Sequence, residues 1–553
     1  SVDLKQTIYG HQDAVNKEVK YYSWSERSDA PLTEGTSDKY DIIYNVDKDR
    51  VSSVRIDTNQ NGANINKDFI DNSASDCGGA ICNDYGTIGD ITGDFIGNSA
   101  SAGGAIFNSD GTIGNITGDF IGNSSDGNGG AIYNHDSSQD PKSLATSDDS
   151  LEAMNNNVYS TVIGNITGNF IGNSANEDGG AICNEMGSIG NITGDFVGNS
   201  ANGAGGAIAN GGSAIGNITG DFIGNSAMSG GAIANGGSAI DNITGDFVGN
   251  RAFGSGGAVY NDYGTIGNIT GDFIGNSSDG NGGAIYNHDS SQDPKSLATS
   301  DDSLEAMNNN VYSTVIGNIT GNFIGNSARS GGAIYNSEGV IGNITGDFVG
   351  NTALGYLGGA IYNEGTIGDI TGDFIGNRTY RDGGAIYNNY GAIIGDIAGD
   401  FIGNGAKYDG GAIYNEGTIG DITGSFVNNY SNYFGNNTFG GAIANVDLGS
   451  IGDITADFIN NNATTAGGAI YNDNTVYNHG PVRGTGIFIG NITGDFIGNS
   501  AGQAGGAIYN SISEPACEDL DDSNADSENL DTLANRSNIG YISGSFIGNH
   551  AGE

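Results

Sequence analysis

Proline, cysteine and positively charged residues are all scarce in this chain. Its 553 residues include 5 Pro, 4 Cys and 18 Lys and Arg, against 99 Gly and 65 Asp and Glu. So much Gly with so little Pro, and without a three-residue period, excludes a collagen-like chain. Hydrophobic residues make up 36% of the sequence, which is enough to build a core and argues against wholesale disorder.

The four cysteines, Cys77, Cys82, Cys183 and Cys517, are too few for a disulfide scaffold in a chain of this length. Cys82 and Cys183 replace Tyr in a recurring GGAIYN motif, so each is expected to be a small buried filler. Several repeats separate these two residues, and we do not expect them to pair. With no CxxC motif and only 5 His, a zinc site is not expected either.

Long apolar runs are also missing. No stretch approaches the length of a membrane-spanning helix, and the chain starts at Ser1 without a secretory leader, as expected of a processed product. The formal net charge is −47, and nearly all of it falls after residue 67. Such a surface repels phosphate backbones, so nucleic acid is not an expected partner, whereas cations would be attracted. Acidity also keeps a secreted protein soluble without any further role.

What the sequence has instead is repetition. A GGA motif followed by Ile or Val occurs fifteen times, mostly 25 to 27 residues apart, as in GGAIYNEGTIGDITGDFIGN at Gly358–Asn377. Short β-branched and aromatic runs between Gly and Asn, without a 3.6-residue apolar period, predict strands rather than helices. So short a unit can bury its apolar face only when stacked on copies of itself. We therefore predict an all-β chain, a parallel β-helix (solenoid) of about 15–16 coils of about 25 residues.

Stacking two or three short strands per coil places like residues in columns. Phe95 and its equivalents would form an inward aromatic ladder, and Ile81 and Ile91 would begin aliphatic ladders. Asn83 begins one column of Asn at a bend, and Asn98, with Asn72 before it, belongs to a second. In each, one side-chain amide can bond the same amide one coil above. The paired Gly before Ala permits a positive φ and close backbone packing at a corner. Stacking alone explains most of the recurring residues.

Residues 1–65 do not repeat, and they contain the only Trp, Trp24. A solenoid needs a cap over its first open coil, so we interpret this region as an N-terminal cap, with a docking region for a partner as the alternative. Residues 66–553 form the repeat array, with insertions near 135–161, 288–314, 472–488 and 511–538. Loops that leave a solenoid often build its binding face, although surface decoration explains them equally well.

A column of acids follows the Thr of the ITGD motif along the predicted outer face. Carboxylates stacked about 4.8 Å apart repel one another unless water and salt screen them or cations bridge them. Ca²⁺ is the hard cation that such oxygens would bind. The candidate ligands are Asp94, Asp119, Asp195, Asp221, Asp246 and Asp272.

The Ile or Val that follows each Phe, at Ile96 and its equivalents, leaves two alternatives open. Strict alternation would turn this position outward and create an aliphatic stripe suited to lateral association. A bend after the Phe would turn it inward instead.

No catalytic or cofactor-binding residues stand out. β-Helix enzymes that cleave polysaccharides set two or three acids, often with Lys, Arg or His, on adjacent coils. Here the acids are uniform along the array, and residues 68–553 hold only nine Lys and Arg. We therefore predict that the chain is not an enzyme and that it takes no cofactor other than the candidate Ca²⁺.

The pairing of GGA[I/V] with FxxN resembles the passenger repeats of bacterial polymorphic outer-membrane proteins, part of the autotransporter group. It is carried, for example, by GGAICN…DFIGN at Gly78–Asn98 and by the stretch at Gly358–Asn377, and it covers about residues 66–550. Adhesin-like surface proteins of gut archaea look similar. The resemblance implies a right-handed parallel β-helix exported to the cell surface, with adhesion as the usual role. The chain would then be a passenger fragment, a released passenger or a protein retained in another way.

Together these observations predict an elongated, secreted or cell-surface adhesin, or a structural spacer. Its expected partner is a host or neighbouring-cell surface, or a glycan. The alternative is an extracellular filament subunit that binds itself end to end. The array stops at SFIGNHAGE without a polar cap, and the exposed edges of a final coil could pair with the next molecule. A polysaccharide-active enzyme is the third hypothesis.

Overall fold

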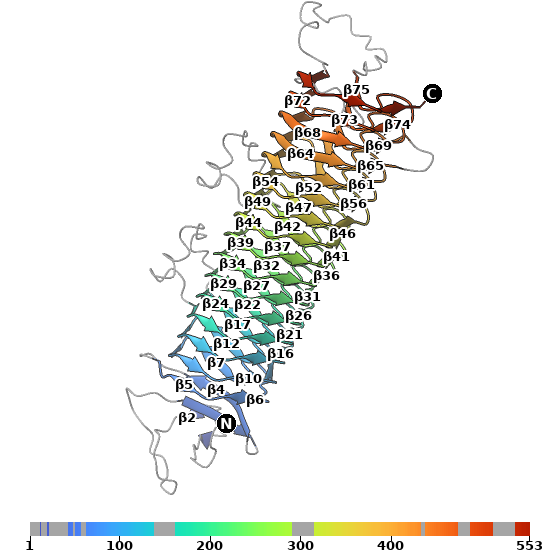
Figure 1. Ribbon diagram of the computed structural model, residues 1–553. Coiled ribbons are helices and arrows are strands. Elements are labelled where there is room, and N and C mark those ends of the chain that lie inside the picture. The colour runs from blue at the N-terminus through green and yellow to red at the C-terminus, as the bar shows by residue number, and fades with distance from the viewer. Residues whose placement is uncertain are drawn as a thin grey trace, which may run out of the picture. The chain divides into compact units, whose positions relative to one another are not determined.

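The computed structural model describes residues 62–137, 161–289, 314–432, 437–473, 487–511 and 537–552, and the backbone of four strands before them. All the regular structure in these residues is β-strand. The chain divides into two compact units, Ser1–Thr270 and Gly271–Glu553, and each is a stack of coils (Figure 1). Most of each predicted insertion lies outside the described residues, and so does Trp24.

One repeat makes one coil of five short strands. The first such coil consists of β7 (Ile81–Asp84), β8 (Thr87–Ile88), β9 (Ile91–Thr92), β10 (Phe95–Ile96) and β11 (Ser99–Ala100). The next coil repeats the order as β12 (Ile106–Ser109), β13 (Thr112–Ile113), β14 (Ile116–Thr117), β15 (Phe120–Ile121) and β16 (Ser124–Ser125). In the second unit, an example is β52 (Ile361–Asn363), β53 (Thr366–Ile367), β54 (Ile370–Thr371), β55 (Phe374–Ile375) and β56 (Arg378–Thr379).

Neighbouring coils pair in parallel, with like residues opposite each other. In the first unit β10 pairs with β15 through Phe95 and Phe120. In the second unit β55 pairs with β60 (Phe401–Ile402) through Phe374 and Phe401. The predicted parallel β-helix is thereby confirmed, whereas its right hand stays a prediction. The expectation of two or three strands per coil is wrong, because Gly bends such as Gly93 divide the longer runs into two-residue strands.

The core of each unit is a stack of phenylalanine rings. Phe95 and Phe120 have ring centroids 4.7 Å apart, and Phe374 and Phe401 have the same separation. All four side chains are completely buried. The strand spacing of a β-sheet sets this separation, since each ring lies over the ring of the coil below. The predicted aromatic ladder is confirmed, as are the aliphatic columns that contain Ile81 and Ile91.

Two buried columns of asparagine close the bends of each coil. Asn98 Nδ2 donates to Asn123 Oδ1 at 2.9 Å, and the backbone N–H of Asn98 donates to the same oxygen. In the other column, Asn83 Nδ2 donates to Asn108 Oδ1 at 2.7 Å. Buried polar groups are costly unless they are bonded, and these ladders bond the amides from coil to coil. Among the described residues, the exception is Asn83 Oδ1, which is buried without a hydrogen-bond partner. Both predicted Asn ladders are therefore confirmed.

The two glycines of the GGA motif have different roles at their corner. Gly205 has a φ of +66°, a left-handed conformation that favours glycine. Gly206 lies so close to the next coil that an added Cβ would stand 2.1 Å from the Gly231 carbonyl oxygen. One glycine therefore turns the chain, and the other lets two coils approach each other.

Near the N-terminus, β3 (Ile42–Asp47) and β4 (Arg50–Ile56) pair in an antiparallel hairpin. β4 also pairs in parallel with β7, with Val54 opposite Ile81. A second antiparallel pair joins β1 (His11–Gln12) and β2 (Val19–Lys20). Strand β4 thus adds to the same sheet as the first coil. That residues 1–65 act as a cap or as a docking region stays a prediction.

The cysteines differ in part from the expectation. Cys77 and Cys82 form a disulfide with a Cα–Cα distance of 5.7 Å, so the prediction that Cys82 is a simple buried filler is wrong. The turn at Gly78 brings the two residues together. Cys183 is free and buried, as predicted for the same position of another coil. Cys517 lies outside the described residues.

Candidate functional site

The outer face of each coil formed by the ITGDFI segment presents three kinds of side chain in chain order. Thr92 is exposed, Asp94 is partly exposed, Phe95 is buried, and Ile96 is partly exposed. Because coils stack in register, each position continues as a column through its unit. Thr92 and Asp94 therefore face outward as predicted.

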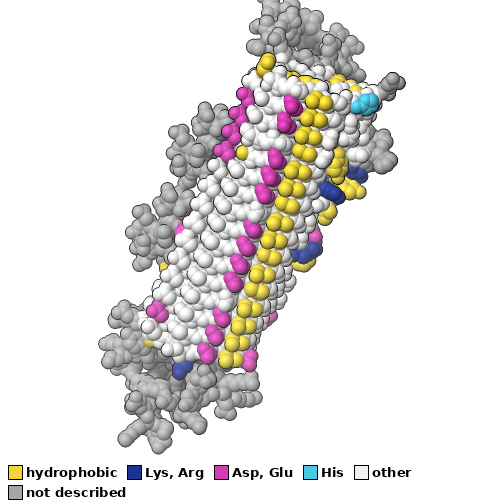
Figure 2. Space-filling view, viewed as in Figure 1, with side chains coloured by type: hydrophobic (Ala, Val, Ile, Leu, Met, Phe, Trp, Pro, Cys, Tyr) yellow, Lys and Arg dark blue, Asp and Glu magenta, His cyan; other side chains and the backbone are white. Residues whose placement is uncertain are grey.

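The Ile and Val side chains after each Phe also face outward, which decides between the two alternatives that the sequence left open. Ile171 and Ile223 are each 38% exposed, whereas the neighbouring Phe170 and Phe222 are completely buried. We call this column the aliphatic stripe. Figure 2 shows a stripe of hydrophobic side chains in each unit, running beside a column of Asp and Glu.

The other edge of the aliphatic stripe is bare backbone. Gly122, Gly172 and Gly224 follow stripe residues, and each has a φ between +61° and +63°. A Cβ added to any of the three would meet no atom within 4 Å. At these three coils nothing stands beside the stripe on this side, so its methyl groups there are open to a partner.

The six predicted metal ligands stand at the same position of their coils, five in the first unit and Asp272 in the second, and they include five that accept a hydrogen bond from the next coil. Asp94 Oδ1 accepts the backbone N–H of Asp119 at 2.9 Å, and Asp195 Oδ1 accepts that of Asp221 at 2.9 Å. Asp119, Asp221 and Asp272 accept the equivalent N–H in the same way. A bond that joins each acid to the next coil explains why acids or amides recur here. Among the described residues, no group of three or more His, Cys, Asp or Glu is arranged to hold a metal ion. Ca²⁺ on this column stays a prediction.

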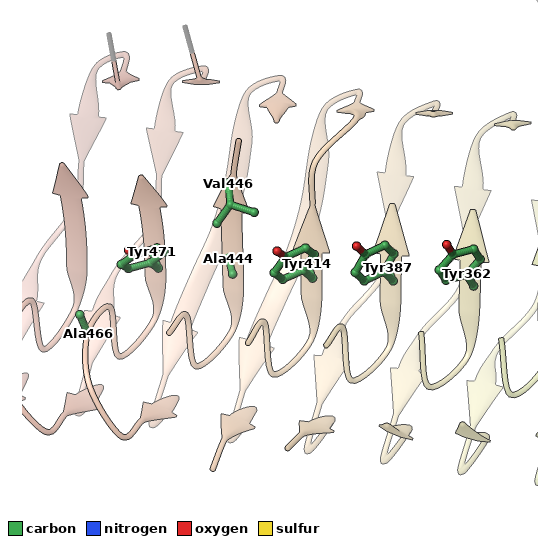
Figure 3. Close-up of a cluster of buried hydrophobic side chains, with 7 residues drawn as sticks. All are labelled: Tyr362, Tyr387, Tyr414, Ala444, Val446, Ala466 and Tyr471. Carbon is green, nitrogen blue, oxygen red and sulfur yellow. The ribbon is translucent and has the colours of Figure 1, made fainter. Parts of the chain in front are cut away.

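A buried ladder of tyrosine and glutamate in the second unit was not predicted. Tyr362, Tyr387 and Tyr414 lie on successive strands with their hydroxyls turned the same way (Figure 3). Their ring centroids are 5.2 and 4.9 Å apart. Glu364 accepts hydrogen bonds from Tyr335 and Tyr362, so one carboxylate joins two coils.

Glu416 joins Tyr387 and Tyr414 in the same way, with both hydroxyls donating at 3.1 Å. Burial, reinforced by the Glu416 carboxylate, raises the pKa of Tyr387 far above its ordinary value. The tyrosines therefore stay neutral donors. The sequence did contain a signal for this ladder, since GGAIYNEG repeats in two coils with Glu directly after the Asn.

The first unit has a smaller polar group at the same position of the coil. The Tyr133 hydroxyl donates to Glu185 of the next coil, and His135 Nδ1 lies 3.5 Å from the Glu185 carboxylate. The interaction with Glu185 raises the pKa of His135, and the interaction with His135 lowers the pKa of Glu185. This arrangement holds two coils together beside the point where residues 138–160 leave the described chain.

Comparison with known proteins identifies the repeat. The family model of the Chlamydia polymorphic membrane protein repeat matches residues 68–84, 118–135, 167–185, 271–288, 372–389, 399–416 and 455–473. Each match runs from the strand that holds the ladder Phe to the strand that holds the buried Asn of GGAIYN. No curated protein sequence and no solved structure matches the chain. Among the described residues, no helix is long and apolar enough to cross a membrane. The seven matches show that the chain carries repeats of the polymorphic membrane protein type, and the structure builds them into a parallel β-helix.

Proposed function

We propose that the chain is a cell-surface adhesin that attaches to a neighbouring cell through its aliphatic stripe. The repeat is that of surface-exposed, adhesin-like membrane proteins, which supports a location outside the cell. The observation that carries the proposal is the stripe itself, an outward column of Ile and Val that continues from coil to coil in each unit. Contiguous exposed apolar surface of this kind marks interaction sites.

The geometry of the stripe suits a multivalent, individually weak contact. Each side chain remains partly exposed, with values such as 38% for Ile223, so each would contribute about 1 kcal/mol or less when covered. The coil spacing places a new methyl-bearing residue every few ångströms, as the 4.7 Å ring separation of Phe95 and Phe120 indicates. Strong attachment would then come from many coils binding at once.

To test this proposal, the chain is displayed on a non-adherent bacterium, and the bacteria that attach to an epithelial monolayer are counted. The stripe variant is Ile121→Thr/Ile171→Thr/Ile223→Thr, because Thr keeps the β-branched shape that suits a strand. The control replaces an outward Thr in each of the same three coils by Ser (Thr117, Thr167 and Thr219). We expect the stripe variant to lose most attachment and the control to keep it, with unchanged thermal unfolding in both.

Three results would contradict this function. Attachment that is equal in the stripe variant and the parent chain would remove the stripe from the mechanism. Absence of attachment in the parent chain would favour the structural spacer. Clumping of the displaying bacteria with one another, without attachment to the monolayer, would favour the self-associating filament subunit.

A further inference from the structure

Positive charge gathers at one corner of the coils. Between residues 68 and 552, the described residues hold five Lys and Arg: Arg251, Arg329, Arg378, Arg381 and Lys407. Each lies in, or within two residues after, the strand that corresponds to β11. Four of the five belong to the second unit, where they occupy three of four successive coils. Figure 2 shows Lys and Arg side chains together with hydrophobic ones along one edge of the visible face.

Exposed aromatic rings lie among these cations. Tyr356 is 44% exposed and Tyr380 is 57% exposed. The guanidinium carbon of Arg329 lies 5.3 Å from the centre of the Tyr356 ring, and Lys407 Nζ lies 4.1 Å from the centre of the Tyr380 ring. Each ring thus holds a cation from a neighbouring coil at contact distance. We call Arg329, Tyr356, Arg378, Tyr380, Arg381 and Lys407 the cation–tyrosine patch.

Hydrogen bonds between coils hold the backbone of this corner in place. The Tyr356 N–H donates to the Arg329 carbonyl at 2.8 Å, and the Tyr408 N–H donates to the Arg381 carbonyl at 2.9 Å. The Thr379 hydroxyl donates to the Tyr356 carbonyl at 2.6 Å. A ligand would therefore meet a surface whose backbone is already ordered, which lowers the entropy cost of binding.

The acids nearest to the patch are turned toward the backbone. Asp382 Oδ1 accepts the N–H of Asp409 at 2.9 Å, and Asp409 Oδ1 accepts the N–H of Phe439 at 2.8 Å. Burial raises the pKa of Asp382 to about 6 and also raises that of Asp409. One oxygen of each carboxylate is thus engaged by a backbone N–H of the next coil, while Arg329, Arg378 and Arg381 remain exposed.

We propose that the cation–tyrosine patch binds an anionic polysaccharide, with its carboxylate or sulfate groups on the Arg and Lys side chains and its sugar rings on the Tyr faces. Sugar rings present C–H faces that pack on aromatic rings, and Arg forms charge-assisted hydrogen bonds to carboxylate and sulfate oxygens. The patch extends over three coil spacings, about 14 Å at the ordinary strand spacing, which suits a short stretch of a linear chain. This inference deepens the proposed adhesin by naming one ligand class.

Two other classes of polymer fit the patch less well. A nucleic acid carries so dense a charge that the acidic remainder of the molecule, with a net charge of −47, would repel it. An acidic peptide would use the cations but has no ring faces to match the exposed tyrosines. A polysaccharide with one charge on every sugar or every second sugar can contact both the cations and the tyrosine rings.

Biolayer interferometry with the purified full chain tests the proposal, with the glycan immobilised. The probes are a polygalacturonate hexasaccharide, a chondroitin sulfate hexasaccharide, the neutral cellohexaose and a poly-glutamate peptide. We expect binding to one or both anionic hexasaccharides, weakened by added salt, and at least tenfold weaker binding to cellohexaose and to the peptide. The two anionic probes distinguish a carboxylate polymer from one that also carries sulfate.

Two variants separate the roles of charge and ring. Arg329→Gln/Lys407→Gln should weaken binding at least tenfold and reduce its salt dependence, and Tyr356→Leu/Tyr380→Leu should weaken it while keeping the salt dependence. The matched control is Arg251→Gln in the first unit, because Arg251 also lies over an aromatic ring, Phe253 at 5.0 Å, but is the one Lys or Arg among the described residues between 68 and 270. This control should bind like the parent chain.

The proposal is overturned if neither anionic hexasaccharide binds, if the control loses as much affinity as the patch variants, or if poly-glutamate binds as tightly as the glycans. The last result would assign the patch to an acidic protein. Attachment of displaying bacteria without glycan binding would reject the patch and leave the adhesin intact. Glycan binding by the purified chain without attachment would reject the stripe-mediated adhesin and leave the patch.

Discussion

Asn225→Ala tests whether the buried asparagine column holds the coils together. The Asn225 side chain makes four hydrogen bonds that all lie in the interior of the first unit. Its Nδ2 donates to Asn250 Oδ1 at 3.0 Å and to the Phe196 carbonyl at 2.9 Å. Its Oδ1 accepts from the N–H and the Nδ2 of Asn199, at 2.9 and 3.0 Å.

Alanine would remove all four bonds, and water cannot replace them because the site is completely buried. The Asn199 N–H would lose its acceptor, and the Phe196 carbonyl would lose a donor. An unsatisfied buried polar group costs about 1–3 kcal/mol, so two such groups together cost about 2–6 kcal/mol of the free energy of unfolding. This is a large part of the stability of a typical domain.

Asn217→Ala is the matched control, since Asn217 belongs to the same coil and forms a similar ladder at the surface. Its Oδ1 accepts the N–H and Nδ2 of Asn242 at 3.2 and 3.0 Å, where water can take over both bonds. We expect a loss of about 1 kcal/mol or less. Urea unfolding gives the overall change. Hydrogen exchange of peptides around Asn225 shows whether the opening is local, as expected for a repeat array. Equal losses in the two variants would refute the assignment of stability to the buried column.

Three further predictions concern protonation, the disulfide and Ca²⁺. Asp382→Asn/Asp409→Asn should raise the free energy of unfolding by about 1–3 kcal/mol near pH 7.5, because the raised pKa values mean that the native acids destabilise the fold as they ionise. The stabilisation by the double variant should vanish near pH 4, where the native acids are protonated. Thermal unfolding measured at both pH values tests this, and an equal rise in unfolding temperature at pH 4 and pH 7.5 would contradict the prediction. Cys77→Ser should cost about 2 kcal/mol by opening a short covalent loop, and peptide mapping without reductant should recover Cys77 linked to Cys82; its absence would reject the disulfide. Millimolar Ca²⁺ should raise the unfolding temperature relative to EDTA through the second oxygens of the Asp94 column, and an identical temperature would remove Ca²⁺ from the account.

Most of the fold could be predicted because each recurring residue has a single physical use. Phe95 and Asn98 recur in every coil since an inward ring and a bonded amide are both needed there. The period of the sequence therefore determined the register, and the register determined which residues stack. The direction of Ile96 could not be predicted, because a bend between Phe95 and Ile96 would have turned it inward. In the structure the two residues alternate within one strand, β10, and the bend comes after Ile96, at Gly97, where φ is +65°.

The candidate sites were harder to predict because they arise from exceptions to the repeat. Arg329, Tyr380 and Lys407 stand at equivalent positions of different coils, but each differs from its neighbours in type. Their proximity becomes visible only when the coils are stacked. The disulfide was missed for the opposite reason, since Cys77 and Cys82 are so close in sequence that only the turn between them makes the bond possible.

The in-register coil has a consequence for how such a gene can change. Residues 111–175 and 264–328 are identical, and the offset of 153 residues spans whole repeats. Because every coil offers the same upper and lower surface to its neighbours, unequal crossing-over between repeats inserts or deletes complete layers without creating a mismatched junction. A single recombination event can therefore lengthen or shorten the stack of coils, and it can also change the position of a loop along the stack.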